Sequence, residues 1–326
     1  MGMSFIDSRK VYMSLISSYN LYLDTGQRFD TISSGNAVQI KHINTGEEFY
    51  CVKISNMGYN QTPEIWKRII FRPANNSFFW PIDIIDMISE DNGDREYYLV
   101  YPFRFVPEVK PLAELVKTEG FLGVEQSSTR LIIKNFLEAF ITFYECSYLY
   151  NVWDESHLFI NTKDNSILIS FNDAMTVNER NAVCIDSKVF FSEYTDPYAY
   201  ANGSLYDEKS ECFAVASILF FLLIGRYPYE GSLMDGVPKD SESEIEYWKK
   251  NYLSHPIFIF DTNDKRNAIG DFSDEKIFLN RWQSLSDELK EMFAAFFCES
   301  NIMRTTENSV SYSLFDWKKA IDNYFC

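Results

Sequence analysis

The side chains of this sequence that could take part in catalysis are concentrated around two short apolar runs, which are joined by a polar turn. Residues 158–160 and 167–169 are separated by polar residues, a pattern that predicts a tight β-hairpin. In several enzyme families such a hairpin carries catalytic residues just before its first strand and just after its second. Here Val152, His157 and Ser170 occupy those positions. Because valine cannot accept a proton or a hydrogen bond, the segment has the outline of an active site but lacks part of its chemistry.

Two carboxylates beside the hairpin are the other possible source of chemistry. Asp154 lies two residues after Val152, and Asp173 lies three residues after Ser170. A rearranged loop would bring both carboxylates toward the hairpin end, where they could act in proton transfer or metal binding. In the alternative interpretation, Asp154 only flanks the hairpin and Asp173 caps a loop. The sequence leaves both interpretations open.

The elements that must position these residues change in character near residue 105. Before this point the pattern is mainly that of strands, because polar and apolar residues alternate on both sides of the turn at residues 44–46. A short helix is predicted in this part, where Thr62 and Pro63 form a typical helix start. After residue 102 the spacing is mostly helical. The predicted strands cover residues 37–42, 48–54, 79–84 and 97–101, and the main predicted helices cover residues 63–71, 127–148, 213–224, 286–297 and 313–324.

This order of elements resembles that of a protein kinase, and individual residues add to the resemblance. Lys53, in the segment Y-C-V-K-I, matches the lysine of the V-A-I-K motif, which holds nucleotide phosphates and pairs with a glutamate on the next helix. Glu64 is the candidate for that glutamate. Gly35 is the single glycine where the family has a glycine-rich loop. The segments W-P-I-D from Trp80, Y-P-Y-E-G from Tyr227 and P-I-F-I-F-D from residue 256 resemble a bacterial branch of the superfamily.

The resemblance covers roughly residues 28 to 325 and implies an α+β, two-lobed protein kinase-like fold. A small five-stranded antiparallel N-lobe with one helix is expected over residues 28–104, after an N-terminal extension over residues 1–27. A larger helical C-lobe is expected over residues 105–326, with a cleft between the lobes.

Four further residues are assigned by the same resemblance. Glu211 stands where kinases place an aspartate at the start of a buried helix, and Arg304 resembles an arginine that clasps a glutamate late in the helical lobe. The partner position of Arg304 falls near Asn202, so a neutral side chain or Asp207 would replace that glutamate. We expect Glu211 and Arg304 to have architectural roles.

The resemblance also shows what is missing from the candidate site. Kinases use a catalytic aspartate, and they hold magnesium with an asparagine and a second aspartate. Counting from the hairpin places Val152, His157 and Ser170 at these positions. A neutral imidazole and a single hydroxyl are poor ligands for Mg²⁺, which prefers charged or amide oxygens. Lys53 would then keep either a residual nucleotide contact or a buried pair with Glu64 that steadies the N-lobe.

Composition excludes several other classes of function. The formal net charge of -17 opposes binding to nucleic acid and to anionic membranes. No apolar run reaches the ~18 residues that a membrane-spanning helix needs. The six cysteines include no C-x-x-C pair, and the three histidines lack the spacing of metal ligands. We therefore expect no metal site, and cysteines kept as free thiols in a reducing cytoplasm.

Together these patterns predict a catalytically inactive kinase-like protein, a pseudokinase, that acts as a protein-binding or allosteric module in bacterial signalling. A protein partner follows by elimination, and no cofactor is required, although ATP could bind without magnesium through Lys53, Glu64 and Gly35. One alternative is an unconventional ATP-dependent phosphotransferase that uses Asp154 and Asp173. Another is a metal-independent nucleotide sensor. The aromatic residues of segment 176–204 fit an interface and packing under a loop equally well.

Overall fold

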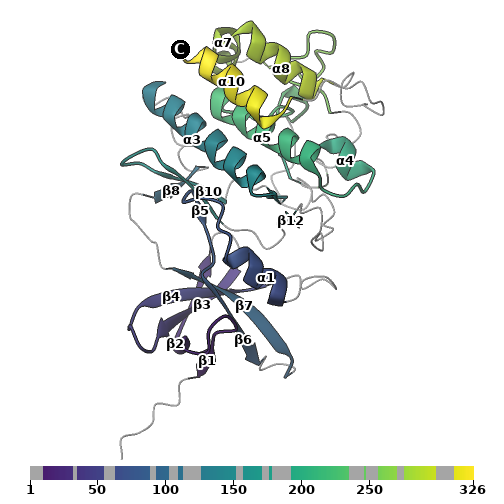
Figure 1. Cartoon of the computed structure of the whole chain (residues 1–326). Coiled ribbons are helices and arrows are strands. Elements are labelled where there is room, and N and C mark those ends of the chain that lie inside the picture. Colours follow the sequence, from purple (N-terminus) through teal and green to yellow (C-terminus); the bar gives the residue numbers. More distant parts are fainter. Residues whose placement is uncertain are drawn as a thin grey trace, which may run out of the picture.

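The structure is a computed structural model of the chain, in which a strand-rich part and a helical part lie one above the other (Figure 1). It describes residues 10–31, 35–54, 63–88, 93–102, 109–112, 126–151, 157–170, 176–177, 192–234, 246, 256–269, 275–298 and 312–326.

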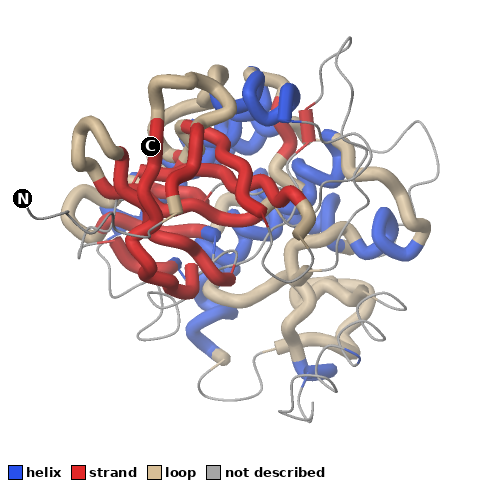
Figure 2. Tube along the Cα trace, turned by 90° about the horizontal axis from the view of Figure 1, so that it is seen from below, coloured by secondary structure: helices blue, strands red, loops and turns tan. Residues whose placement is uncertain are grey.

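The strand-rich part is a six-stranded antiparallel sheet with the order β1-β2-β3-β4-β7-β6. Ser14, just after β1, forms a bridge with Ile85 of β6, and the N–H of Leu15 donates to the carbonyl of Ile84 at 2.8 Å. The first strand therefore meets the last, and the sheet nearly closes into a barrel. Figure 2 looks at this sheet from below. The strands are β1 (Val11–Met13), β2 (Leu21–Thr31), β3 (Gly35–His42), β4 (Glu48–Lys53), β6 (Asp83–Ile88) and β7 (Arg95–Pro102).

The predicted two-lobed kinase-like fold with a five-stranded N-lobe is wrong, because the sheet has six strands and closes through β1. The physical reason is a small apolar core on one face of the sheet, which Tyr12 of β1 and Tyr22 of β2 help to bury. The expected boundary after residue 27 falls inside β2. The core residues are Tyr12, Tyr22, Val38, Ile40, Cys51, Ile85, Met87 and Val100.

The hairpin predicted at residues 158–169 is confirmed. β10 (Leu158–Asn161) and β11 (Ile167–Ser170) pair antiparallel, with Leu158 opposite Ile169. They form the middle of a four-stranded sheet of order β5-β11-β10-β8, in which β5 is Phe78–Phe79 and β8 is Val109–Pro111. A third, two-stranded sheet joins β9 (Tyr148–Leu149) to β12 (Thr176–Val177).

The helices in the described part of the chain lie mostly in the C-terminal half. The predicted buried helix is confirmed in α5, whose residues from Ser210 to Ile224 are all buried. α5 ends at Gly225, which has φ of 89° and adopts the left-handed conformation typical of a helix end. The helices are α1 (Pro63–Ile70), α3 (Gln126–Glu145), α4 (Pro197–Ala201), α5 (Glu208–Ile224), α7 (Lys276–Ser284), α8 (Asp287–Phe297) and α10 (Leu314–Tyr324), with a 3₁₀ turn at Ser232–Met234. None of them is both long enough and apolar enough to cross a membrane.

Aromatic side chains join the two parts of the molecule. Phe78 of β5 stacks on Phe143 of α3 with ring centroids 4.5 Å apart, and it also contacts Trp80, Phe140 and Tyr150. Phe78 is only 2% exposed and belongs to a core that runs from the sheet into the helices. The β10–β11 hairpin, which is paired with β5, is therefore held by tightly packed apolar contacts.

Two of the segments that suggested a bacterial kinase-like branch bind each other directly. The N–H of Ile259 donates to the carbonyl of Pro228 at 3.0 Å. The side-chain amide of Asn267 donates to the carbonyls of Tyr229 and Ile257, each at 2.8 Å. These segments have an architectural role, because hydrogen bonds to their backbone hold one loop against the other.

Candidate functional site

His157 and Ser170, two of the predicted site residues, lie at the same end of the β10–β11 hairpin. Leu158 and Ile169 are paired, His157 immediately precedes Leu158, and Ser170 immediately follows Ile169. Both side chains are buried, at 7% and 8% exposure. The hairpin therefore brings together the two positions at which the resemblance expects magnesium ligands. The other predicted positions here, Val152, Asp154 and Asp173, lie outside the described residues.

Tyr150 connects this hairpin end to the helical part. Its hydroxyl donates to the carbonyl of Ser170 at 2.7 Å, and its ring lies edge-on to that of His157. Its backbone N–H donates to Oε1 of Glu211 at 3.1 Å, while the hydroxyl of Tyr206 donates to Oε2 of the same carboxylate. The architectural role expected for Glu211 is confirmed, because its buried carboxylate holds the backbone just before residue 152.

The chain turns sharply after Tyr150. Asn151 is buried and has φ of 69°, in the left-handed region that asparagine tolerates better than most residues. Ser170 has a buried hydroxyl that forms no hydrogen bond with any residue in the described ranges. A hydroxyl of this kind is neutral, so it brings no negative charge to the site.

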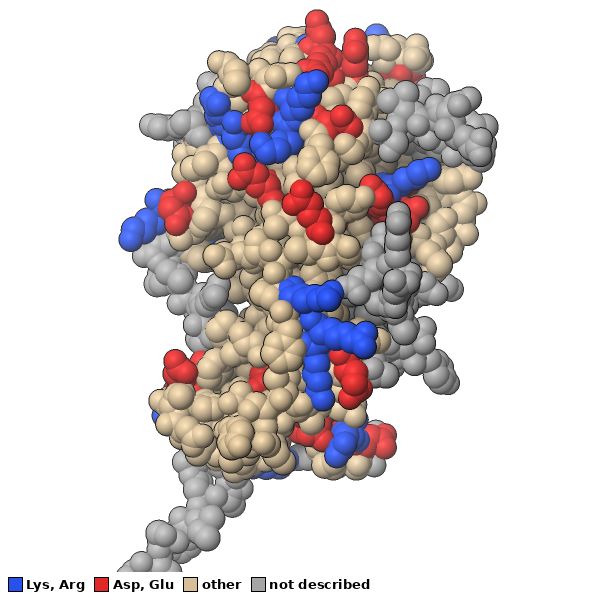
Figure 3. Space-filling view, in the orientation of Figure 1, with Lys and Arg blue, Asp and Glu red and all other residues tan. Residues whose placement is uncertain are grey.

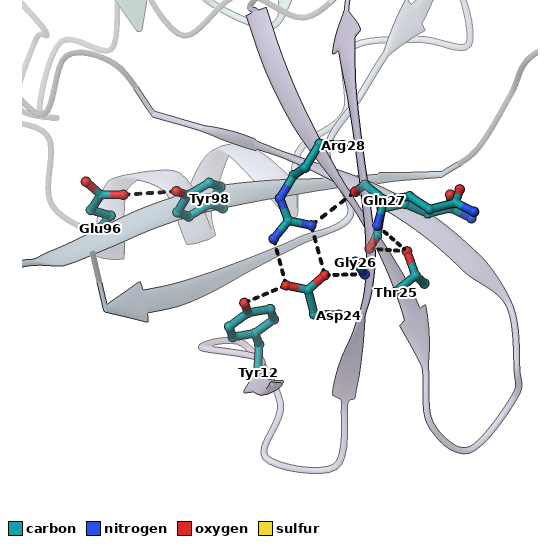
Figure 4. A network of polar contacts seen from close by, with 9 residues as sticks. Tyr12, Asp24, Thr25, Gly26, Gln27, Arg28, Glu96 and Tyr98 are labelled. Atoms are coloured by element: carbon teal, nitrogen blue, oxygen red, sulfur yellow. Dashed lines mark hydrogen bonds and ion pairs between the residues drawn. The ribbon is translucent and has the colours of Figure 1, made fainter. Parts of the chain in front are cut away.

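The predicted pair of Lys53 with Glu64 is wrong. Nζ of Lys53 lies 2.6 Å from Oε1 of Glu96, and the lysine side chain is about half exposed. The other oxygen of Glu96 accepts a hydrogen bond from the hydroxyl of Tyr98 at 2.9 Å (Figure 4). Glu64 is on α1, where its nearest cation in the described residues is Lys67, with Oε1 3.8 Å from Nζ.

The alternation of side chains along β4 explains why Lys53 does not pair with Glu64. Val52 and Ile54 belong to the main core together with Trp66 and Ile69 of α1, whereas Cys51 belongs to the small core on the opposite face of the sheet. Successive side chains of a strand point to opposite faces, so Lys53 points away from α1. The ladder continues past the strand, because the N–H of Ile54 donates to the carbonyl of Tyr97 at 2.9 Å. An isoleucine therefore occupies the position that faces α1.

The remaining predicted residues are dispersed. Gly35 begins β3 opposite Thr31 and follows residues outside the described ranges. Arg304 is also outside them. Asn202 ends α4, where its side-chain amide donates to the carbonyl of Tyr198 at 2.9 Å. Asp207 begins α5 and accepts from the N–H of Ser210 at 2.9 Å.

β2 also holds a buried charged network that the sequence patterns did not indicate. Asp24 is 6% exposed and accepts hydrogen bonds from both terminal nitrogens of Arg28, from the N–H of Gly26 and from the hydroxyl of Tyr12 (Figure 4). Burial raises the pKa of Asp24, but these donors outweigh burial and hold that pKa below its ordinary value. Burial, followed by the nearby Asp24 carboxylate, raises the pKa of Tyr12 well above its ordinary value. The alternation of side chains along the strand could have indicated that Asp24 is buried, because it places Asp24 on the same strand face as Tyr22.

A second buried carboxylate, Asp83, fastens the first two strands to β6. It is 1% exposed and accepts from the hydroxyls of Ser14 at 2.6 Å and Tyr22 at 2.9 Å, and from the amide of Asn20 at 3.2 Å. The N–H of Ile84 completes the set at 2.8 Å. The last residue of the W-P-I-D segment therefore has an architectural role that the sequence alone did not reveal.

A polar hollow of about 280 Å³ lies among the described residues. It lies at the turn end of the hairpin, away from His157 and Ser170, because Ser166 and Ile167 line it. Its other lining residues come from the segment before β5 and from α3: Asn75, Ser77, Asn135, Glu138, Ala139 and Thr142. Across the described ranges, no three His, Cys, Asp or Glu side chains are grouped so that they could hold a metal ion.

Compared with known proteins, the sequence matches no family model and no curated protein. The relation to protein kinases therefore stays a prediction from the residues.

Proposed function

We propose that this chain is a catalytically inactive relative of protein kinases that acts by binding another protein in a bacterial signalling system. The proposal rests on side-chain chemistry and not on the number of strands. The observation that carries it is that His157 and Ser170 flank the paired residues Leu158 and Ile169 at one hairpin end, where the resemblance expects two magnesium ligands. Phosphoryl transfer needs charge neutralisation by bound metal ions, and an imidazole beside a hydroxyl supplies no negative charge for this purpose.

The contacts of Lys53 support the same function. A phosphate-binding lysine has to project toward the nucleotide, but Lys53 is bound to Glu96 and faces away from α1. Ile54, which faces α1, is 4% exposed and offers no charge. Metal-independent nucleotide sensing through Lys53 is therefore less favoured than protein binding.

We place the protein in the cytoplasm as part of this proposal. Cys51, Cys146, Cys212, Cys298 and Cys326 are free thiols, as expected in a reducing compartment. Burial raises the pKa of Cys51 and Cys212 well above the ordinary value, so these two thiols are poor nucleophiles.

Transfer of labelled phosphate tests the absence of catalysis. The wild type is incubated with γ-labelled ATP and magnesium, beside an active protein kinase as positive control, and resolved on a gel. We expect no label on the chain or on a generic acceptor protein. Label that disappears in Asp154→Asn or Asp173→Asn would establish the unconventional phosphotransferase instead and overturn the proposal.

Thermal shift separates the nucleotide sensor from the protein-binding module. A sensor would be stabilised by ATP in the presence of EDTA, because any ligand specific to the folded state raises its stability. We expect the midpoint of unfolding to be the same with and without ATP. A shift that is lost in Lys53→Ala would identify the sensor.

A further inference from the structure

The outward side of α1 carries a basic and aromatic surface, which we define as Lys67, Arg68, Phe71 and Arg72. Arg68, Phe71 and Arg72 are exposed, and Phe71 is 69% exposed. The segment from Pro63 to Arg72 contains three basic residues and one acidic residue, within a chain of net charge -17. Figure 3 shows basic side chains gathered over α1 in the middle of the face drawn. The surface is therefore locally positive on a strongly negative protein.

This surface stands on a fixed support. The inner side of α1 buries Trp66 and Ile69. At the helix end, the indole N–H of Trp80 donates to the carbonyl of Ile69 at 3.0 Å, and the hydroxyl of Tyr148 donates to the carbonyl of Arg72 at 2.9 Å. Carbonyls at a helix end otherwise lack partners, so these two bonds hold the last turn in place. Phe71 is therefore exposed although the turn that carries it is held in place.

The charges of Lys67 and Arg68 are only weakly neutralised by the residues that the structure describes. Lys67 lies 3.8 Å from Glu64, a spacing of one helix turn at which an exposed pair contributes little. Arg68 forms no hydrogen bond or ion pair with another residue that the structure describes. Its guanidinium can therefore engage a carboxylate in a two-bond contact, which is the strongest form of such pairing.

The composition matches what protein interfaces favour. Aromatic residues and arginine are enriched among the residues that dominate binding energy, and an exposed phenylalanine loses apolar surface to water when a partner covers it. The local positive charge attracts a partner of negative charge. Three basic residues make a small footprint for nucleic acid, which the net charge of -17 opposes over the whole surface.

We propose that the α1 surface docks an acidic segment of a partner protein, with a carboxylate at Arg68 and an apolar side chain on Phe71. This proposal names the class of partner for the protein-binding role and rests on that proposed function. The two can fail separately, because docking is measured without ATP and catalysis is measured by phosphate transfer.

Fluorescence anisotropy at low and moderate salt tests the docking. The probe is a fluorescein-labelled dodecapeptide of glutamates with two phenylalanines. We expect the wild type to bind it, and binding to weaken with salt and to fall about tenfold or more in the Arg68→Glu/Arg72→Glu double variant. Phe71→Ala should also weaken binding, and circular dichroism should show both variants folded. The matched control is Lys276→Glu/Lys319→Glu, which makes the same charge change at exposed positions on α7 and α10 and should bind within about twofold of wild type.

Four outcomes would overturn the proposal. The first is no peptide binding by the wild type, and the second is equal loss of binding in the control variant. The third is binding of a single-stranded oligothymidine in place of the peptide, which would assign the surface to nucleic acid. The fourth is sedimentation as a dimer that only Arg68→Glu/Arg72→Glu dissociates, which would assign the surface to a second copy of the chain.

Discussion

Removal of the buried Asp83 carboxylate should release the first two strands from the sheet. Asp83 accepts three side-chain hydrogen bonds, from Ser14, Asn20 and Tyr22, all of which belong to the strands β1 and β2 or to the turn between them. In Asp83→Ala these buried donors lose their acceptor. The bridge between Ser14 and Ile85 of β6 then loses the side-chain hydrogen bond that supports it. The variant therefore tests the sixth strand, which is the feature that distinguishes this sheet from the predicted one.

The magnitude follows from the number of bonds lost. Hydrogen bonds to a charged group contribute about 1.5–3 kcal/mol each, and entry of water into the vacated space offsets part of the loss. We expect Asp83→Ala to lower the free energy of opening of β1 and β2 by about 3–4 kcal/mol. Because about 1.4 kcal/mol corresponds to a factor of ten, amide exchange in these strands should accelerate by roughly 10²–10³-fold.

Hydrogen exchange followed by mass spectrometry measures this opening on peptides that cover residues 11–23. The matched control is Asp86→Ala on the same strand, because Asp86 pairs with the exposed Arg95 at 2.8 Å and such pairs contribute about 0–1 kcal/mol. Asp83→Asn keeps one acceptor oxygen and should give an intermediate effect. Exchange in Asp83→Ala that accelerates no more than in Asp86→Ala would refute the reasoning.

Three more predictions follow from the structure. Lys53→Met and Glu96→Gln should each change the free energy of unfolding in urea by less than about 1 kcal/mol, since the lysine side chain of the pair is half exposed, and a loss of several kcal/mol would contradict this. The Asp24 carboxylate, whose pKa is lowered on folding, should contribute stability at neutral pH that is lost as the pH falls below the ordinary value of 3.8; thermal midpoints of wild type and Asp24→Asn should converge there, and a constant difference would contradict the assignment. Gly225→Ala should cost about 1–2 kcal/mol in urea unfolding, because φ is 89° and the added Cβ would crowd Nη1 of Arg281; a cost below about 0.5 kcal/mol would show that the left-handed turn relaxes freely.

The sequence predicts local elements well where a single physical signal dominates. The hairpin around residues 158–169 follows from two apolar runs and a polar turn, and α5 follows from a run that is apolar on every helix face. The helices predicted at residues 286–297 and 313–324 correspond to α8 and α10, whose N-caps are Ser286 and Ser313.

The errors arose where a long-range contact decides the outcome. β1 has only three residues, and its place beside β6 depends on Asp83, which lies far along the sequence. Lys53 matched a motif by residue type, but strand parity places Ile54 on the face toward α1, and one residue of offset exchanges the two faces of a strand. Matching letters to a motif does not reveal which face a side chain occupies.

Calorimetric titration with ATP tests the central claim most directly, because it asks whether the site retains any metal-dependent nucleotide chemistry. The titration is run with magnesium and with EDTA on the wild type and on Lys53→Ala. We expect little or no heat that depends on magnesium, and the same result for both proteins. Micromolar affinity for Mg-ATP that is absent in EDTA and lost in Lys53→Ala would contradict it.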